Sequence, residues 1–129
     1  MKALDTPVLL GILHNSRWAK DLLKGLRGEE LATTELNMFE LKLLASEGSR
    51  AQGNSRDAAL ARLRNRITVL PVTGDSVREA ARFVRGRGRP ADYLPLVWGT
   101  LAAAGCGEWI TTRAYAPPKG PNRFKVRIV

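Results

Sequence analysis

The sequence predicts an α/β fold: a single three-layer domain with a mostly parallel central sheet and helices on both faces. Short apolar runs, several of them rich in β-branched residues, alternate with longer segments whose apolar residues recur at helical spacing. Such alternation favours a parallel sheet that is covered on both faces. Because the 129 residues contain no internal repeat and no linker, we expect one domain over residues 1–129.

The composition is typical of a globular protein, with 44% hydrophobic and 26% charged residues. Disordered and disulfide-rich chains are therefore excluded. The single cysteine, Cys106, cannot form an internal disulfide, which fits a reducing cytoplasm. The longest uncharged apolar run, Leu94–Cys106, has about 13 residues, whereas a membrane span needs about 20. We expect a cytoplasmic protein without a membrane segment.

The first 28 residues predict a strand and two helices. Residues 2–5 form a short apolar strand, and Thr6 followed by Pro7 is a typical helix start with Thr6 as the N-cap. A second helix is expected from Ser16 to Leu26, before Gly28. The residues expected on the buried faces of the two helices are Val8, Leu9, Ile12 and Leu13, and then Trp18, Leu22, Leu23 and Leu26.

A second strand, Leu31–Thr33, precedes a long helix that Thr34 is expected to cap. Its apolar face is expected to carry Leu36, Phe39, Leu43 and Leu44. The segment Gly48–Gly53 should end this helix. Asn54, with Asp57 three residues later, is the expected cap of a further helix that runs to about Arg64.

The β-branched segment Ile67–Val72 predicts the third strand. Ser76 and Glu79 have the spacing of a capping box, which predicts a helix to about Val84. After a loop at Gly86–Pro90, an apolar helix is expected from Asp92 or Leu94 to about Ala104.

Two strands are expected near the end of the chain. Trp109–Thr111 predicts the fourth strand, and residues 116–121 an irregular loop. From Phe124 to Ile128 apolar residues alternate with Lys125 and Arg127, which predicts a half-exposed edge strand. The tryptophans, Trp18, Trp98 and Trp109, are expected in the core or an interface.

The net charge indicates a polyanionic partner. The chain has 21 Lys and Arg against 12 Asp and Glu, which gives +9. Nucleic acid is the expected partner of so basic a small chain. Two arginine-rich stretches, from Arg78 to Arg89 and from Arg113 to Arg127, are candidates for contacts with backbone phosphates. The alternative interpretation is a solvated basic face.

Two acids interrupt the apolar pattern. Asp5 ends an apolar strand, and because Thr6 is the expected N-cap, we expect Asp5 to point into the crevice at the strand end. At about 100° per residue, Glu40 shares the helix face of Leu36 and Leu43. An ionised carboxylate on a core-facing stripe needs a compensating cation. That cation would be a metal ion or, alternatively, an arginine.

A parallel sheet would bring the two acids together. Asp5 follows the first strand, and Glu40 lies two turns into the helix after the second. Convergent carboxylates suit Mg²⁺ or Mn²⁺, which prefer oxygen ligands. Such sites hydrolyse phosphodiesters by polarising the phosphate and activating a water. An acidic metal pocket within a basic surface therefore predicts a nuclease.

Several stretches resemble motifs of the PIN domain family. Residues 4–10, LDTPVLL, resemble its opening strand motif, and residues 31–41, LATTELNMFEL, closely resemble its second motif, which ends in an acid and a leucine. Val69–Val72 with the helix around Glu79, and the late strand within Gly105–Thr112, fit the same order. The resemblance covers essentially the whole chain. It implies a metal-dependent ribonuclease similar to the small VapC-type toxins.

The resemblance carries over only some of the family's acidic set. It implies Asp5 and Glu40 as metal ligands and catalytic residues, with Asp92 as the third, holding Mg²⁺ or Mn²⁺. The family's spacing places that third acid at Leu94, about 200° around a helix from Asp92.

The family's fourth acid has no counterpart in this chain. It follows a Thr-Arg pair, but Ala114 follows Thr112-Arg113 here. Glu108 would lie at the opposite end of its strand.

The implied function is a VapC-like endoribonuclease that forms a homodimer and is held by an antitoxin, one of whose basic residues enters the acidic pocket. Thr6 or Thr111 would donate hydrogen bonds around the metal ligands. The residues expected to contact the RNA backbone are Arg85, Arg87, Arg89 and Arg113. The alternative is a catalytically degenerate PIN-like domain that binds RNA or a protein without cleavage. A DNA-binding regulator is supported only by the charge and by the alternating arginines and glycines of residues 85–90.

Overall fold

A computed structural model describes residues 1–45, 50–84, 93–112, 116–117 and 123–129, with the backbone alone at 45 and 50–56. These residues form five strands and six helices. The strands are β1 (Lys2–Leu4), β2 (Leu31–Thr34), β3 (Thr68–Leu70), β4 (Glu108–Thr111) and β5 (Lys125–Ile128). The helices are α1 (Thr6–Leu13), α2 (Arg17–Gly25), α3 (Glu35–Ala45), α4 (Arg50–Arg66), α5 (Gly74–Val84) and α6 (Leu94–Ala103).

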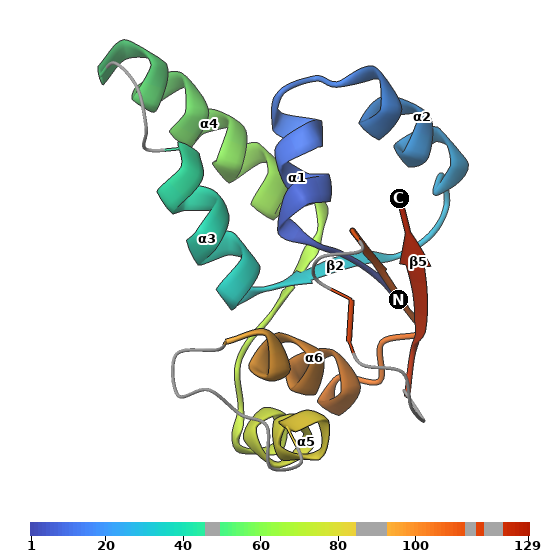
Figure 1. Cartoon of the computed structure of the whole chain (residues 1–129). Coiled ribbons are helices and arrows are strands. Elements are labelled where there is room, and N and C mark those ends of the chain that lie inside the picture. Colours follow the sequence, from blue (N-terminus) through green and yellow to red (C-terminus); the bar gives the residue numbers. More distant parts are fainter. Residues whose placement is uncertain (46–49, 85–92, 113–115, 118–122) are drawn as a thin grey trace.

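The five strands form one parallel sheet in the order β3-β2-β1-β4-β5 (Figure 1). β1 is central: its Ala3 is aligned with Ala32 of β2 on one side and with Trp109 of β4 on the other. β5 lies at one edge, as its alternating sequence predicted. The predicted α/β fold with a parallel sheet is therefore confirmed.

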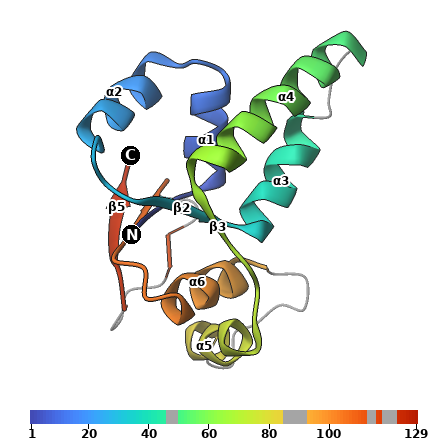
Figure 2. The same ribbon diagram turned by 180° about the vertical axis from the view of Figure 1, so that it is seen from behind.

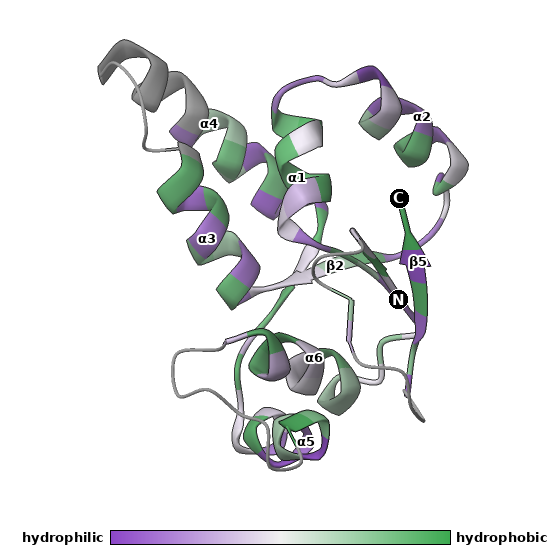
Figure 3. Cartoon of the chain, in the orientation of Figure 1, coloured by the Kyte–Doolittle hydropathy of each residue, from purple (hydrophilic) through white to green (hydrophobic). Residues whose placement is uncertain are grey.

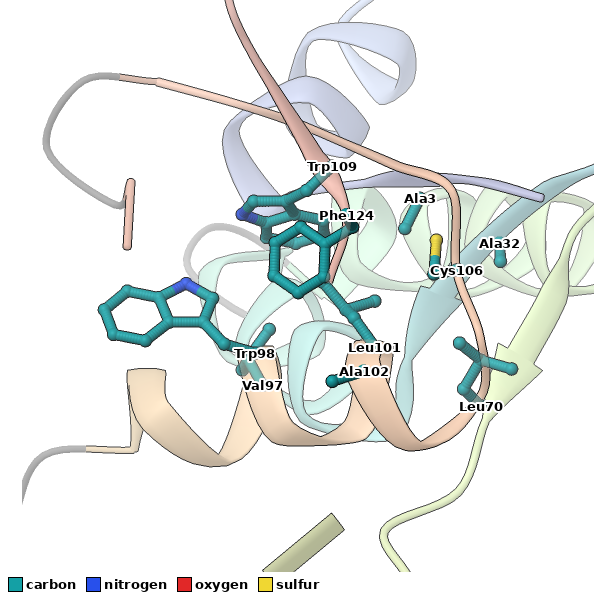
Figure 4. Packing of buried hydrophobic residues seen from close by; sticks show 10 residues of the cluster. All are labelled: Ala3, Ala32, Leu70, Val97, Trp98, Leu101, Ala102, Cys106, Trp109 and Phe124. Atoms are coloured by element: carbon teal, nitrogen blue, oxygen red, sulfur yellow. The ribbon is translucent and has the colours of Figure 1, made fainter. Parts of the chain in front are cut away.

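Helices cover both faces of the sheet, with α1 to α4 on one side and α5 and α6 on the other (Figures 1 and 2). Successive residues of a strand point to opposite faces. Leu4 and Ile110 accordingly join the core under α1, α3 and α4, whereas Ala3 and Trp109 join the core that includes α6. Figure 4 shows the second core, in which Trp98 and Trp109 are buried as predicted, together with Cys106.

The carboxyl ends of the strands define the edge where a site is expected. The chain passes from β1 to β2 and β3 on one side, and then returns to add β4 and β5 on the other. The sheet therefore has a topological switch point beside β1, where ligands bind in parallel α/β folds. Asp5 directly follows β1 at this point, and its backbone N–H donates to the Ile110 carbonyl at 3.0 Å.

The cap of α1 differs from the prediction. Asp5, not Thr6, is the N-cap, and the Asp5 side chain accepts a hydrogen bond from the Thr6 backbone N–H. A carboxylate is favoured at this position because it also interacts with the positive end of the helix dipole. Asp5 therefore has a capping role as well as its place at the strand end.

The predicted capping box of α5 is wrong in register. The reciprocal pair is Thr73 with Ser76: the Thr73 backbone N–H donates to Ser76 Oγ at 3.0 Å, and the Ser76 N–H donates to Thr73 Oγ1 at 3.2 Å. Glu79 instead forms an ion pair with Arg123 at 3.0 Å. The helix therefore begins at Gly74, before the predicted start at Ser76.

α4 begins at Arg50, so the predicted cap at Asn54 is wrong. The helix continues through Gly53, which costs about 1 kcal/mol relative to alanine. Burial of Leu60 and Leu63 in the core offsets this cost, because each buried leucine contributes about 2 kcal/mol.

Trp18 is 46% exposed, so its expected place in the core is wrong, whereas the alternative place in an interface stays a prediction. Its indole ring lies over Gly11, where an added Cβ would be 2.4 Å from the ring. Trp18 therefore covers the corner between α1 and α2 from outside.

Among the described residues, no helix combines the length and apolar content that a membrane span requires.

α5 and α6 pack closely because Gly99 lacks a side chain. A Cβ at Gly99 would lie 2.3 Å from the Ser76 carbonyl oxygen and 2.5 Å from the Ala80 nitrogen. These are backbone atoms, so no side-chain rotation could relieve the contact. The helix pair that covers one face of the sheet therefore depends on this glycine.

Gly99→Ala is expected to lower the free energy of unfolding by about 1–3 kcal/mol because of this overlap. Gly25→Ala is the matched control, since nothing lies within 4 Å of an added Cβ there. The control should be neutral or stabilising by up to about 1 kcal/mol. Urea unfolding of both variants measures the difference, and equal midpoints would contradict the packing argument.

Candidate functional site

Asp5 is a buried carboxyl group at the switch point of the sheet, with only 2% of its surface exposed. Its Oδ1 accepts hydrogen bonds from the Thr6 backbone N–H at 2.7 Å and from Asn37 Nδ2 at 3.0 Å. Its Oδ2 accepts a hydrogen bond from Thr111 Oγ1 at 2.5 Å. The three donors belong to α1, α3 and β4, so only the folded chain assembles them.

Asn37 is a site residue that the sequence patterns did not single out. It is 1% exposed, and its Nδ2 donates to both Asp5 Oδ1 and Thr6 Oγ1 at 3.0 Å. Its Oδ1 accepts from the Thr34 hydroxyl at 2.6 Å, and its backbone N–H donates to Thr34 Oγ1 at 3.2 Å. The sequence does contain a signal for it. Asn37 lies three residues after the predicted cap, Thr34, and three before Glu40, a spacing that places residues on one face of a helix.

The two threonines proposed for the site lie beside Asp5 and are buried. Thr111 donates its hydroxyl directly to the Asp5 carboxylate. Thr6 gives Asp5 its backbone N–H, while its hydroxyl accepts from Asn37. The site therefore contains a network of hydroxyl and amide groups around one carboxylate.

Glu40 lies on α3 one turn after Asn37 and is half-buried. The predicted apolar stripe of this helix is wrong at three of its four positions: Phe39, Leu43 and Leu44 are 64%, 55% and 40% exposed. Only Leu36 packs against the core. The buried face instead carries Asn37, Met38 and Leu41. The helix turns this face inward because Met38 and Leu41 join the core with residues of α1 and α4. Glu40 therefore lies at the border of the core rather than inside it.

The pKa values of the Asp5 and Glu40 carboxyl groups are both raised. Burial raises the pKa of Asp5, although the hydrogen bonds from Thr111, Thr6 and Asn37 act to lower it. Burial also raises the pKa of Glu40, and the negative charge of Asp5 raises it further. The negative charge of Asp5 thus disfavours the ionised form of Glu40.

A hard divalent cation fits this donor set. Among the described residues, neither Asp5 nor Glu40 forms a salt bridge with a lysine or arginine, so the arginine alternative finds no support there. Carboxylate and hydroxyl oxygens are the ligands that Mg²⁺ and Mn²⁺ prefer. No group of three His, Cys, Asp or Glu residues suited to a metal ion occurs in the region that the structure describes. Asp92, the predicted third ligand, lies outside it.

The predicted RNA contacts, Arg85, Arg87, Arg89 and Arg113, also lie outside the described residues. Other members of the two basic stretches form ion pairs on the surface. The pairs are Arg78 with Asp75, Arg82 and Arg123 with Glu79, and Arg127 with Glu108. Glu108 begins β4 and is aligned with Lys2, so it lies at the end of the sheet away from Asp5.

Comparison with known protein families gives a match to the PIN domain over residues 2–97. This range includes Asp5, Asn37 and Glu40, as well as Asp92. Comparison with the curated proteins gives no match.

The fold is similar to chains of several toxin–antitoxin complexes. One is VapBC2 from Rickettsia felis bound to a fragment of promoter DNA, with 10% identity, a TM-score of 0.77, and coverage of 99% of this chain and 98% of that chain. Another is DNA-bound VapBC from Salmonella typhimurium, with 14% identity, a TM-score of 0.72, and coverage of 98% and 96%. A third is VapBC-5 from Mycobacterium tuberculosis, with 21% identity, a TM-score of 0.67, and coverage of 99% and 98%.

Glu40→Gln is expected to stabilise the metal-free chain at pH 7 by about 0.5 kcal/mol, or about 2 °C in Tm. The folded chain raises the pKa of Glu40, so the wild type loses stability as the pH rises through that pKa, whereas the amide does not. The gain should vanish below about pH 4, where the carboxyl group is protonated in both states. Thermal unfolding in EDTA across this pH range measures it.

The matched control is Glu30→Gln, which changes an exposed carboxyl group before β2. It should leave the Tm of the chain nearly unchanged at every pH. A gain for Glu40→Gln that is the same at pH 4 and pH 7 would contradict the electrostatic explanation.

Proposed function

This chain belongs to the PIN domain family, and on that premise we propose that it is a metal-dependent endoribonuclease of the VapC-toxin type. One observation carries the proposal. Asp5 is buried at the switch point of the sheet, its negative charge raises the pKa of Glu40 on α3, and neither acid forms a salt bridge with a described lysine or arginine. Two unneutralised carboxyl groups in a chain of net charge +9 suit a cation that is shared with a phosphate substrate.

Asp5 and Glu40 would hold Mg²⁺ or Mn²⁺, with Asp92 as a third ligand. When bound, the ion would polarise the scissile phosphate and lower the pKa of the attacking water. Asp5 is kept in place by donors from α1, α3 and β4. Glu40 is half-buried and can therefore reach both the ion and solvent. Thr6 and Thr111 would fix the orientation of the Asp5 carboxylate.

RNA is the proposed substrate because the chain is strongly basic and belongs to this family. Arg85, Arg87, Arg89 and Arg113 remain the proposed contacts with the RNA backbone. Such contacts are electrostatic, so RNA binding should weaken steeply as the salt concentration rises.

An antitoxin is the proposed protein partner, because the similar folds come from VapBC complexes. The outer face of α3 is a surface that such a partner could cover. Phe39 and Leu43 lie one turn apart on it and are largely exposed, and Figure 3 shows apolar residues along this helix. Exposed apolar patches of this kind are typical of protein interfaces.

A homodimer and a cytoplasmic location are proposed on the family resemblance.

The alternative function is that of a PIN-like domain that binds RNA or a protein and does not cleave RNA. It is favoured by Ala114, which stands where the family's fourth acid would be. The two functions differ in whether a phosphodiester bond is broken, and one assay separates them.

Wild-type protein with Mn²⁺ is expected to cleave a structured RNA, and EDTA should abolish the cleavage. Asp5→Asn and Glu40→Gln should each lower kcat by about 100-fold or more, because each removes a negative oxygen from the site. Glu30→Gln should cleave like the wild type. The measurement is the rate of fragment formation on denaturing gels.

Cleavage that survives both site substitutions would overturn the assignment of Asp5 and Glu40. An absence of cleavage with retained, salt-sensitive RNA binding would favour the binding module instead.

Light scattering tests the proposed dimer. The purified chain should have twice its 14.2 kDa mass. If α3 is reserved for the antitoxin, Phe39→Ser should leave that mass unchanged. A monomeric wild type would refute the dimer, and a dimer lost in Phe39→Ser would show that the α3 face joins two copies instead.

A further inference from the structure

The hydrogen bonds of Asp5 are distributed unequally between its two oxygens. A carboxylate offers about four lone-pair sites, two on each oxygen. Oδ1 accepts from both the Thr6 backbone N–H and Asn37 Nδ2, so its two sites are filled. Oδ2 accepts only from Thr111 Oγ1 among the described residues. Three of the four sites are therefore occupied by these donors, and the remaining one belongs to Oδ2.

Asn37 is itself held in a single orientation. Its carbonyl oxygen accepts from the Thr34 hydroxyl at 2.6 Å, so the amide nitrogen must face Asp5. Its two N–H groups are both used, one on Asp5 Oδ1 and one on Thr6 Oγ1. Thr34 and Asn37 are 0% and 1% exposed, so water does not compete for these bonds.

We infer that Asn37 is a positioning residue that limits Asp5 to a single-oxygen contact with the cation, made through Oδ2. This inference rests on the proposed function, because it concerns the same metal site. Asn37 does not touch the cation; it acts by filling Oδ1 and by fixing the plane of the carboxylate. The chain thereby leaves one defined lone pair for the ion and prevents a two-oxygen contact.

Mn²⁺ binding without RNA tests the positioning role. Asn37→Ala should weaken the Mn²⁺ affinity of the purified chain by about tenfold or more, the usual effect of losing a residue that orients a metal ligand. Asn65→Ala, which removes the same group from an exposed position on α4, should bind Mn²⁺ like the wild type. Calorimetric titration gives both affinities, and circular dichroism at the same temperature checks that each variant is folded.

Asn37→Ser provides a second variant in case the alanine variant does not fold. A serine hydroxyl has one proton and cannot donate to Asp5 and Thr6 together, so it should show a smaller loss of affinity. A crystal structure of the Mn²⁺-loaded wild type tests the contact itself. It should show the ion on Asp5 Oδ2 alone.

Unchanged Mn²⁺ affinity in a folded Asn37 variant, or an ion bound through Oδ1 or through both oxygens, would overturn this inference while leaving the proposed nuclease intact. Absence of Mn²⁺ binding to the wild type would overturn both. A wild type that binds Mn²⁺ through Oδ2, with the expected loss in Asn37→Ala, but cleaves no RNA would uphold the inference and overturn the proposed function.

Discussion

The burial of the Asp5 carboxyl group is the constraint on which the arrangement of the site depends. A buried polar group without hydrogen bonds costs about 1–3 kcal/mol, and a charged one costs more. The chain meets this requirement with a backbone N–H from α1, an amide from α3 and a hydroxyl from β4. Each donor is fixed by the element that carries it, so the position of Asp5 links three segments that are distant in sequence.

The sheet order explains why these segments meet. β1 lies between β2 and β4, so the ends of all three strands reach the same edge. α1 begins directly after β1, and α3 begins directly after β2. The positive ends of both helix dipoles therefore face this edge, where they favour negative charge. The fold supplies an environment for a carboxylate in addition to its individual hydrogen bonds.

Membership of the PIN domain family and the geometry of the site are consistent with each other. The chain is basic overall, yet Asp5 and Glu40 interact with no basic partner among the described residues. Without a cation, the two negative charges repel each other and destabilise the folded chain. A cation that binds between the acids and a polyanion removes this repulsion. The proposed nuclease activity depends on this gain in stability when the cation and the polyanion bind.

The sequence alone determined the alternation of strands and helices, the edge position of β5 and the placement of Asp5 at a strand end. These features follow from local periodicity and from the chemistry of single residues. Only the tertiary structure decided which face of α3 is buried, because Leu36, Leu43, Met38 and Leu41 are all apolar and local periodicity does not rank them. The choice depends on packing against α1 and α4, and it brings Asn37 to Asp5 from 32 positions away in the chain. Hydrogen bonds over such separations exist only after the sheet has set the order of its strands. The spacing of Asn37 from Thr34 and Glu40 therefore marks it as a candidate, but its bonds to Asp5 and Thr6 are decided by the tertiary structure.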